Sequence, residues 1–391
     1  MPKLILKEGR EKSILNHHPW LFSGAIAKIE GSLQNGDVVD IYSKKNIFLG
    51  KGFYNEKTSI AVRLLTFLDE KIDQEFWIKK IQQAKELREA MFNAEYTNAY
   101  RVVHGEGDFL PGLTLDNYAG HYALQISSLG LDKQKAELLA AIKEVCNPKS
   151  IYEKSNLPSR KVEGLDPFCG QLNGQTPDKI EIIENKLSFL VDIIRGQKTG
   201  FFLDQRDNRQ YLSGLVKDKK ILNCFCYTGG FTIYAAHGGA QESLSIDMSE
   251  EALALAQENF KINNMAQDKH KLLKANVAEY LRSVANQEFD LIILDPPAFT
   301  KNLKNVSTAA RGYKDINLQA LKILKKGGIL VTCSCSQHLD RLLFQKIVHD
   351  AAMDAKRELQ IISIKGQAPD HPINISHPEG EYLKCLFCYV S

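Results

Sequence analysis

Two cysteines follow an apolar segment in the C-terminal part of the chain. Residues 328–332 are typical of a buried strand, and Cys333 and Cys335 come directly after it. A thiolate there could add to C6 of a cytosine, which makes C5 enamine-like and able to attack a methyl group. Cys335 lies just past the expected strand and should face a site, whereas Cys333 should lie deeper. We therefore predict that Cys335 is a nucleophile and Cys333 a core thiol.

An aspartate and two prolines end a second apolar segment. Residues 289–295 are a strand candidate that ends at Asp295, and Pro296 and Pro297 follow it. The prolines fix the backbone and lack an N–H, while Asp295 can accept a hydrogen bond from the exocyclic amine of a base. Nucleobase methyltransferases use this arrangement; a strand that simply stops at two prolines is the alternative.

A glycine pair lies at the end of a third strand candidate, residues 221–225. Thr228, Gly229 and Gly230 lead directly into a helical pattern, so backbone could approach a ligand closely. The glycine spacing differs from the Gly-x-Gly-x-x-Gly of dinucleotide enzymes, which argues against a nicotinamide-dependent oxidoreductase. Asp247, at the end of the next strand candidate, could accept hydrogen bonds from ribose hydroxyls. Taken alone, the glycine pair and the later acid fit a nucleoside cofactor such as S-adenosylmethionine and an ordinary strand-to-helix turn about equally well.

Two further segments, residues 198–209 and 311–317, mix cations, aromatic rings and amides. Those side chains are the inventory for phosphate contact and base stacking, although a solvated protein face has the same composition. The candidates for RNA contact in them are Lys198, Arg209, Tyr313, Lys314 and Asn317.

Strands and helices alternate after residue 219, and this alternation would position the candidate site residues described above. The alternation predicts a mostly parallel sheet with helices on both faces, and ligands of such sheets bind outside the carboxyl ends of the strands. The strand candidates are residues 221–225, 243–247, 271–273, 289–295 and 328–332, and the helix candidates include 250–263 and 342–355.

The N-terminal half reads as two smaller domains. Its first 68 residues are short strands separated by glycines, which predicts a small β-barrel, and they carry ten Lys or Arg against six Asp or Glu. Beyond them we expect helices over residues 69–93 and 133–145, strands near 113–115 and 122–126, and a connecting loop over 163–179. The predicted domains are residues 1–68, 69–185 and 186–391.

The composition is that of a cytoplasmic globular protein. The 391 residues are 44% hydrophobic and 25% charged, and no apolar run approaches the roughly 20 residues that cross a bilayer. The N-terminus becomes charged too early for a secretory signal. The eight cysteines lack histidines at zinc-ligand spacing, so we expect no metal site. Because no apolar run is long enough to cross a bilayer, we also expect no membrane partner. A net charge of +3 is compatible with a nucleic-acid partner.

Together these motifs resemble one family, the RlmI-like bacterial 23S ribosomal RNA cytosine-5 methyltransferases, over nearly the whole chain. The resemblance implies an α/β fold: a class I (Rossmann-like) methyltransferase domain of seven strands, the last antiparallel, behind an RNA-binding PUA domain and a central α+β domain. The segments that carry it are residues 18–25, 110–116, 198–206, 223–231, 295–297, 312–317, 334–336 and 382–384.

The resemblance also implies the partners and the site. The methyl donor would be S-adenosylmethionine, leaving S-adenosylhomocysteine, and the substrate 23S ribosomal RNA, with Cys335 and Asp295 catalytic. The residues it implies for the cofactor are Phe202, Asp204, Gln205, Arg206, Asn223, Phe225, Tyr227, Thr228, Gly229, Gly230, Asp247, Met248, Asn276, Val277, Asp295 and Pro296.

Two positions depart from related sequences. Ala298 stands where the better-known RNA cytosine-5 methyltransferases carry a second cysteine, so another base must remove the C5 proton. Asn276 replaces an acid and offers an amide to the adenine edge. One alternative is an RNA guanine-N7 methyltransferase on the same scaffold, which needs no thiol; Cys335 argues against it. The other is an inactive RNA-binding ribosome-assembly protein, against which the glycine loop, Asp247, Asp295 and Cys335 argue. The sequence leaves the modified nucleotide, the form of the RNA and the oligomeric state, a homodimer included, open.

Overall fold

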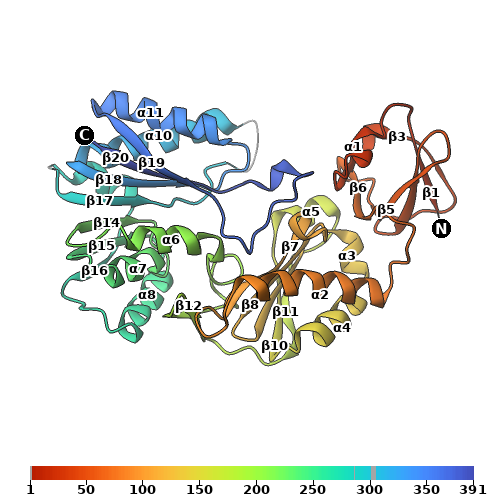
Figure 1. Ribbon diagram of the computed structural model, residues 1–391, viewed down its shortest axis with the longest axis horizontal. Coiled ribbons are helices and arrows are strands. Elements are labelled where there is room, and N and C mark those ends of the chain that lie inside the picture. The colour runs from red at the N-terminus through yellow and green to blue at the C-terminus, as the bar shows by residue number, and fades with distance from the viewer. Residues whose placement is uncertain (1, 286, 301–304) are drawn as a thin grey trace. The chain divides into compact units, whose positions relative to one another are not determined.

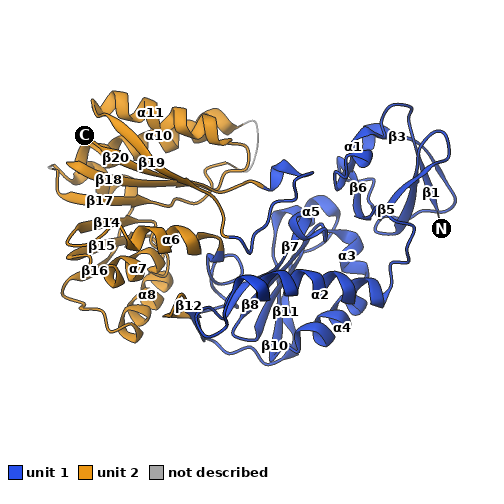
Figure 2. Cartoon of the chain, in the orientation of Figure 1, with its two compact units in different colours: residues 1–183, 191–203, 369–380 blue, residues 184–190, 204–368, 381–391 orange. Residues whose placement is uncertain are grey.

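The computed structural model describes residues 2–285, 287–300 and 305–391 (Figure 1). The chain folds into two compact units (Figure 2). Unit 1 contains residues 1–183, 191–203 and 369–380, and unit 2 contains residues 184–190, 204–368 and 381–391. The chain therefore returns to unit 1 twice after first leaving it. Within the described ranges, no helix is both long and apolar enough to cross a membrane.

Unit 1 begins with a six-stranded sheet in the order β2-β6-β5-β4-β1-β3. Alternate side chains of its strands, such as Leu4 and Leu6 or Val39 and Ile41, are buried in one core, as the period of a half-buried strand requires. The short strands predicted for the first 68 residues are confirmed. The elements are β1 (Lys3–Leu6), α1 (Lys12–Leu15), β2 (Trp20–Phe22), η1 (Ser23–Ala25), β3 (Ile26–Glu30), β4 (Val38–Tyr42), β5 (Phe48–Tyr54) and β6 (Ile60–Thr66).

The rest of unit 1 is built on a five-stranded sheet in the order β11-β10-β9-β8-β7, against which α2 and α4 pack. Trp77 and Ile81 of α2 share a core with Leu138 of α4 and Leu124 of β9. Helix α2 begins after Asp73, whose side chain accepts a hydrogen bond from Phe76 N. The elements are α2 (Gln74–Met91), β7 (Ala99–His104), η2 (Gly105–Asp108), β8 (Leu113–Tyr118), β9 (His121–Ile126), α3 (Leu129–Lys133), α4 (Lys135–Cys146), β10 (Ser150–Ser155), α5 (Pro158–Glu163) and β11 (Phe168–Gly174).

The loop expected over residues 163–179 is wrong in its middle, where β11 pairs antiparallel with β10. Glycines and polar side chains made this segment resemble a loop. An edge strand tolerates them, because it pairs on one side only and most of its side chains remain in water.

Unit 2 is a seven-stranded sheet in the order β16-β15-β14-β17-β18-β20-β19. Strands β14 to β18 pair in parallel, and β20 runs antiparallel to both β18 and β19. Ile221 packs on one face with α6 and α7, whereas Leu222 packs on the other with α10 and α11. The predicted sheet with helices on both faces is confirmed.

A hairpin of β12 (Ile180–Glu184) and β13 (Leu187–Val191) precedes that sheet. The elements that follow are η3 (Leu203–Gln205), α6 (Arg206–Ser213), β14 (Lys220–Cys224), α7 (Gly230–His237), β15 (Glu242–Asp247), α8 (Glu250–Ile262), β16 (His270–Lys274), α9 (Val277–Ser283), β17 (Phe289–Leu294), α10 (Val306–Ile323), β18 (Leu324–Ser334), α11 (Arg341–Ala355), β19 (Leu359–Lys365), η5 (Pro378–Gly380) and β20 (Lys384–Val390).

Candidate active site

The carboxyl ends of four neighbouring parallel strands bring the predicted residues to one edge of the unit 2 sheet. Thr228 follows β14, Asp247 ends β15, Asp295 follows β17 and Cys335 follows β18. Parallel strands that lie side by side present their carboxyl ends at the same edge. A nucleoside site at this edge is thus what the topology permits.

Asp247 holds the loop after β14 in place. Its Oδ2 accepts a hydrogen bond from Tyr227 N at 2.8 Å, and its Oδ1 accepts one from Ser249 N at 3.0 Å. Tyr227 has a φ of 49°, a left-handed conformation that this bond helps to maintain. Sequence reasoning missed this role. Each carboxylate oxygen keeps a second lone pair, so the predicted contact with ribose is compatible with it.

Gly229 has a structural reason to be glycine. Its φ is 81°, it precedes the first turn of α7, and a Cβ there would lie 2.7 Å from Phe260 Cε1. The sequence analysis explained the glycine pair by close approach of the backbone to a ligand. The structure adds that Gly229 is required by its own backbone and by the packing of α8.

Two buried polar atoms under this loop suit a polar ligand. Thr228 is 2% exposed and Asn223 is 1% exposed. Within the described part of the chain, Thr228 Oγ1 and Asn223 Oδ1 have no hydrogen-bond partner. Asn223 Nδ2 donates to Thr232 Oγ1 at 2.9 Å, which fixes the amide. Because unsatisfied buried polar groups are rare in folded proteins, these atoms support a ligand at the loop.

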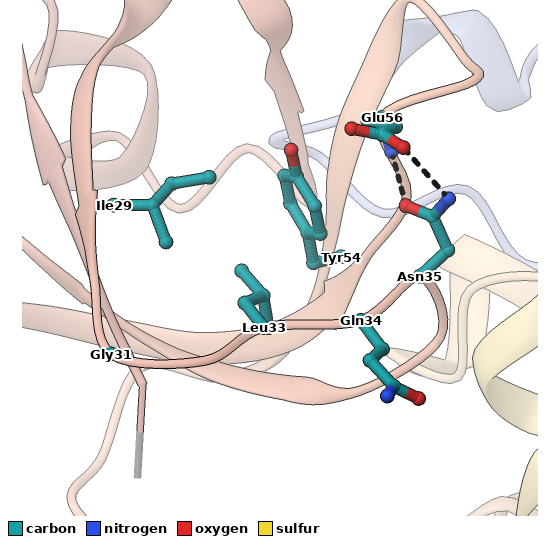
Figure 3. A pocket seen from close by; sticks show the side chains of 7 residues that line it. All are labelled: Ile29, Gly31, Leu33, Gln34, Asn35, Tyr54 and Glu56. Carbon is teal, nitrogen blue, oxygen red and sulfur yellow. Dashed lines mark hydrogen bonds between the residues drawn. The ribbon is translucent and has the colours of Figure 1, made fainter.

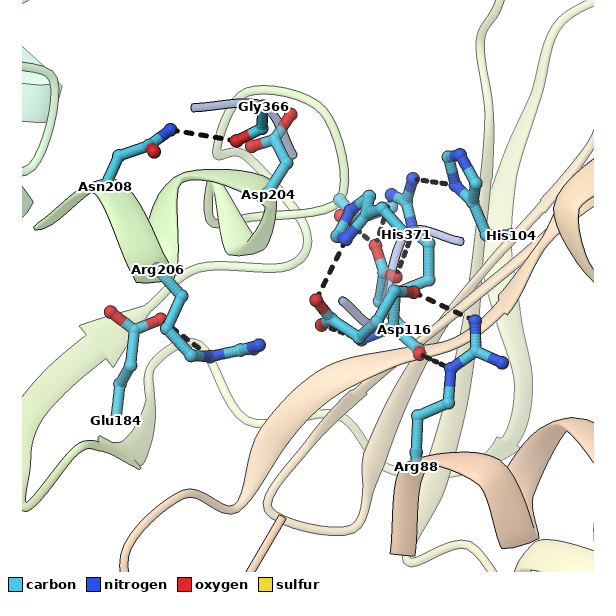
Figure 4. Close-up of polar contacts among 12 residues, drawn as sticks. Arg88, His104, Asp116, Glu184, Asp204, Arg206, Asn208, Gly366 and His371 are labelled. Atoms are coloured by element: carbon cyan, nitrogen blue, oxygen red, sulfur yellow. Dashed lines mark hydrogen bonds and ion pairs between the residues drawn. The ribbon is translucent and has the colours of Figure 1, made fainter. Parts of the chain in front are cut away.

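A short chain of amides orients Asp295. Gln205 Nε2 donates to Asp295 Oδ1 at 3.0 Å, and Gln205 Oε1 accepts from Asn208 Nδ2 at 2.6 Å. Asn208 Nδ2 also donates to Gly366 O at 3.1 Å (Figure 4). Gln205 must therefore direct its N–H group at the carboxylate. Its exposure of 2% suits a positioning role better than direct contact with a cofactor.

The two cysteines of β18 and its end differ in surroundings. Cys333 lies inside the strand, fully buried, with its Sγ 3.2 Å from Cys385 Sγ. That hydrogen bond, together with burial, raises the pKa of Cys333 well above its usual value, so its thiol stays protonated and unreactive. Cys335 follows the last strand residue and is partly exposed. The geometry favours Cys335 as the reactive thiol.

Comparison with known proteins agrees with this architecture. A PUA-like domain profile matches residues 4–67, and a profile described as S-adenosylmethionine-dependent methyltransferase matches residues 156–364, more than half of the chain. A Tolumonas auensis protein named ribosomal RNA large subunit methyltransferase I is 45% identical over 97% of both chains. A Pseudoalteromonas atlantica protein of the same name is 43% identical over 99% of both chains.

The chain belongs to the S-adenosylmethionine-dependent methyltransferases of this family. Two solved structures cover all of the chain, and it covers all of them. One is a protein from Streptococcus mutans assigned as a SAM-dependent methyltransferase, 26% identical with a TM-score of 0.85. The other is assigned as a methyltransferase and was crystallised with SAH, 26% identical with a TM-score of 0.86.

Three of the five residues predicted to contact RNA are buried in this methyltransferase. Tyr313 and Asn317 of α10 are fully buried; Tyr313 Oη lies 3.0 Å from Ser336 Oγ, and Asn317 Nδ2 donates to Tyr313 O at 2.8 Å. Arg209 is 2% exposed and pairs with Glu184. Polar type alone suggested a surface role, but the structure favours internal support of the site for all three.

The two remaining candidates, Lys198 and Lys314, reach the surface. The Lys198 ammonium lies over the Phe202 ring in unit 1, 4.2 Å from its centroid. Lys314 pairs with Asp354 at 2.7 Å. Both side chains are in contact with solvent, as the RNA prediction requires, and Lys314 already has a carboxylate partner.

The other residues predicted for the cofactor fall into two groups in unit 2. Asp204 and Arg206 are buried, and Asp204 Oδ2 accepts from Tyr382 Oη at 2.7 Å. Arg206 Nε lies 3.5 Å from Glu184 Oε2 (Figure 4). Val277 and Pro296 are also buried, whereas Phe225 is partly exposed and Met248 is 61% exposed.

Asn276 caps helix α9, in addition to its predicted contact with the adenine of the cofactor. Its Oδ1 accepts hydrogen bonds from Ala278 N at 2.9 Å and Glu279 N at 3.3 Å, which caps α9. The side chain is exposed, and its Nδ2 is the group that could face an adenine. Asparagine here keeps the cap that an aspartate would also provide.

The PUA-like domain has a pocket of its own. It has a volume of about 450 Å³, and the Asn35 amide and Glu56 carboxylate close one side of it (Figure 3). Its lining residues are Ile29, Gly31, Leu33, Gln34, Asn35, Tyr54 and Glu56. None of the predicted site residues is among them.

Proposed function

We propose that this methyltransferase forms 5-methylcytosine in large-subunit (23S) ribosomal RNA, with Cys335 as covalent nucleophile. The relatives that match nearly the whole chain are named ribosomal RNA large subunit methyltransferases, which supports the substrate. The observation that carries the cytosine-5 assignment is the pair of thiols on β18. Cys335 is partly exposed just after β18, the strand next to β17 and Asp295, whereas Cys333 is fully buried.

The proposed reaction uses this chain's groups in order. The Cys335 thiolate adds to C6, the C5–C6 electron pair moves to C5, and C5 bonds to the methyl group. S-adenosylmethionine supplies that methyl and leaves as S-adenosylhomocysteine. Asp295, oriented by Gln205, accepts a hydrogen bond from the base edge. Loss of the C5 proton to a base then expels the thiolate; Ala298 cannot be that base.

The remaining parts of the chain have matching roles in this proposal. The loop of residues 227–230, tied by Asp247, holds the cofactor. The PUA-like domain, with Lys198 and Lys314, contributes to RNA binding, and a ribosomal substrate would place the enzyme in the cytoplasm. Phosphate contacts of this kind position the RNA without reading its sequence.

The product test is mass spectrometry of nucleosides. Unmodified 23S transcript is incubated with the protein and isotope-labelled S-adenosylmethionine, then digested. We expect labelled 5-methylcytidine. Labelled 7-methylguanosine would overturn the cytosine-5 assignment but keep the cofactor assignment. If this protein adds no label while a control RNA methyltransferase labels its own substrate in the same assay, activity on naked RNA is overturned.

A trapping experiment tests the nucleophile. A transcript that contains 5-fluorocytidine has no C5 proton to lose, so the covalent adduct should accumulate. We expect the adduct with wild type and with Cys333→Ala, and its absence with Cys335→Ala. An adduct retained by Cys335→Ala would refute the assignment.

A further inference from the structure

The two loops that carry the proposed catalytic residues meet at one buried side chain, Tyr313 of α10. Its ring centroid lies 4.5 Å from that of Phe299, which follows Asp295 by four residues. Its hydroxyl lies 3.0 Å from the Oγ atom of Ser336, the residue after Cys335. Tyr313 is fully buried, so bulk water does not compete for either contact. One side chain thus links the loop after β17 to the turn after β18.

The turn after β18 is anchored at Ser336, which is fully buried. Ser336 N donates to Ser334 Oγ at 3.3 Å. Ser336 O accepts from Leu339 N at 3.1 Å and from Lys384 Nζ at 2.7 Å. These bonds use the backbone of Ser336, whereas the bond to Tyr313 joins two side chains. A substitution can therefore remove the bond from α10 and leave the backbone bonds of the turn in place.

The contact of Tyr313 with Phe299 depends on Gly312. A Cβ at Gly312 would lie 3.0 Å from Phe299 Cδ2, closer than ordinary van der Waals contact, so glycine lets the loop after β17 lie directly on α10. Phe344 of α11 packs on the Tyr313 ring nearly at right angles, with 5.6 Å between the centroids. Two aromatic neighbours from different elements thus fix the ring, and with it the place of the hydroxyl.

The hydroxyl of Tyr313 stays protonated. Burial raises the pKa of Tyr313, and the hydroxyls of Ser334 and Ser336 offset this rise only in part. A protonated phenol keeps its hydrogen bond to Ser336 but cannot take up a proton. Tyr313 is therefore not the base that removes the C5 proton, and its role must come from where it holds its neighbours.

We propose that Tyr313 fixes the turn of Cys335 against the loop of Asp295, so that the nucleophile and the acceptor for the base edge keep one relative placement. The meaning of this for catalysis rests on the proposed function. Reacting atoms must approach to about 3–3.5 Å, and a misplacement of about 1 Å can cost about 100-fold in rate. Because Tyr313 is buried and acts through neighbours of both residues, it is a positioning residue.

Two variants break the link from opposite sides. Tyr313→Phe removes the hydroxyl and keeps the ring on Phe299, and Ser336→Ala removes the partner of that hydroxyl. Tyr234→Phe is the matched control, because Tyr234 is a buried tyrosine of α7 in the same unit and its hydroxyl donates to Glu184 Oε1 at 3.0 Å. All variants are compared with wild type as full chains.

Hydrogen exchange of the peptide that contains residues 334–339, followed by mass spectrometry without RNA or cofactor, tests the anchoring itself. We expect exchange about two- to tenfold faster in Tyr313→Phe than in wild type, because one buried hydrogen bond is lost, and no change in the control. Unchanged exchange in folded Tyr313→Phe would overturn the inference, whichever base is methylated. If Tyr313→Phe does not fold, Ser336→Ala is judged by the same criterion.

Single-turnover transfer from labelled S-adenosylmethionine to the RNA tests the consequence. We expect transfer about tenfold slower in Tyr313→Phe and in Ser336→Ala, with the affinities for cofactor and RNA unchanged. The double variant should be no slower than either single variant, since the two hydroxyls form one contact. Faster exchange with an unchanged transfer rate would overturn the positioning role. If wild type forms no 5-methylcytidine while exchange changes as expected, the proposed function is overturned and the anchoring by Tyr313 stands.

Discussion

Replacing Arg209 by methionine should destabilise unit 2 and leave RNA binding almost unchanged. Arg209 donates from Nε and Nη2 to Glu184 at 2.9 and 2.7 Å, and the carboxylate is fully buried. Removing one partner of a buried ion pair costs about 3–5 kcal/mol, because the other charge is left unpaired. Arg206, 3.5 Å from Glu184, remains as a second cation, which puts the expected loss near the lower end, about 3 kcal/mol.

That loss should appear as a lower melting temperature. For a domain of about 150–250 residues, 1 kcal/mol corresponds to about 2–4 °C, so the transition of unit 2 should fall by about 6–12 °C. Thermal unfolding followed by circular dichroism measures it, and RNA affinity is measured by fluorescence anisotropy at one fixed salt concentration. The double variant Arg209→Met with Glu184→Leu should regain part of the stability, because the buried Glu184 charge is removed with its partner while Arg206 loses that carboxylate.

Lys198→Met is the matched control for Arg209→Met. Lys198 is exposed, so its loss should change stability by less than about 0.5 kcal/mol while weakening RNA binding and reducing its salt dependence. The reasoning would be refuted if Arg209→Met melted like wild type but bound RNA more weakly. The guanidinium would then contact RNA, and its buried pairing would not contribute to stability.

Three further substitutions test the positioning of the site. Gly229→Ala should cost about 1–3 kcal/mol, because φ is 81° and the new Cβ meets Phe260, and should weaken S-adenosylmethionine binding in a calorimetric titration; unchanged stability would contradict the packing argument. Asn276→Ala should cost about 1 kcal/mol in urea unfolding through loss of the α9 cap, and a loss below about 0.3 would show that the cap is unimportant. Gln205→Leu should slow single-turnover methyl transfer about tenfold with cofactor affinity retained, since it removes the donor that orients Asp295; an unchanged rate would exclude that role.

The sequence was sufficient for the residues that follow strands. Asp295 and Cys335 end apolar segments that periodicity identifies, and parallel strands bring such ends to one edge. The sequence alone was insufficient to place a polar residue whose partner is buried and distant in the chain. No residue near Arg209 in the sequence indicates that Glu184 is its partner, and Tyr313 is buried next to the distant Ser336. The polar type of these residues therefore predicted exposed side chains, whereas the fold buries them.

Lys384 shows the same limit of prediction from sequence: it is buried at the start of β20 and donates hydrogen bonds to Ser336 O and Tyr382 O. In sequence it is one polar residue before an apolar run, and only the antiparallel register of β20 against β18 brings it opposite Ser334. A signal did exist: a lysine at the start of an otherwise buried segment must find partners for its charge. Its partners could not be named without the pairing of strands that are 50 residues apart, because Ser334 and Lys384 meet only in the folded sheet.

The segment of residues 198–209 read as one motif, yet the fold divides it between the two units. On the unit 1 side, Thr199 Oγ1 donates to Asp116 Oδ2 at 2.6 Å and lies 3.0 Å from Tyr118 Oη. On the unit 2 side, Asp204 O accepts from Ala368 N at 2.9 Å, and Gln205 reaches Asp295. The boundary between the units falls between residues 203 and 204. A continuous motif thus serves two purposes: its first half is anchored in the unit that contains the PUA-like domain, and its second half orients the carboxylate at the methyltransferase edge.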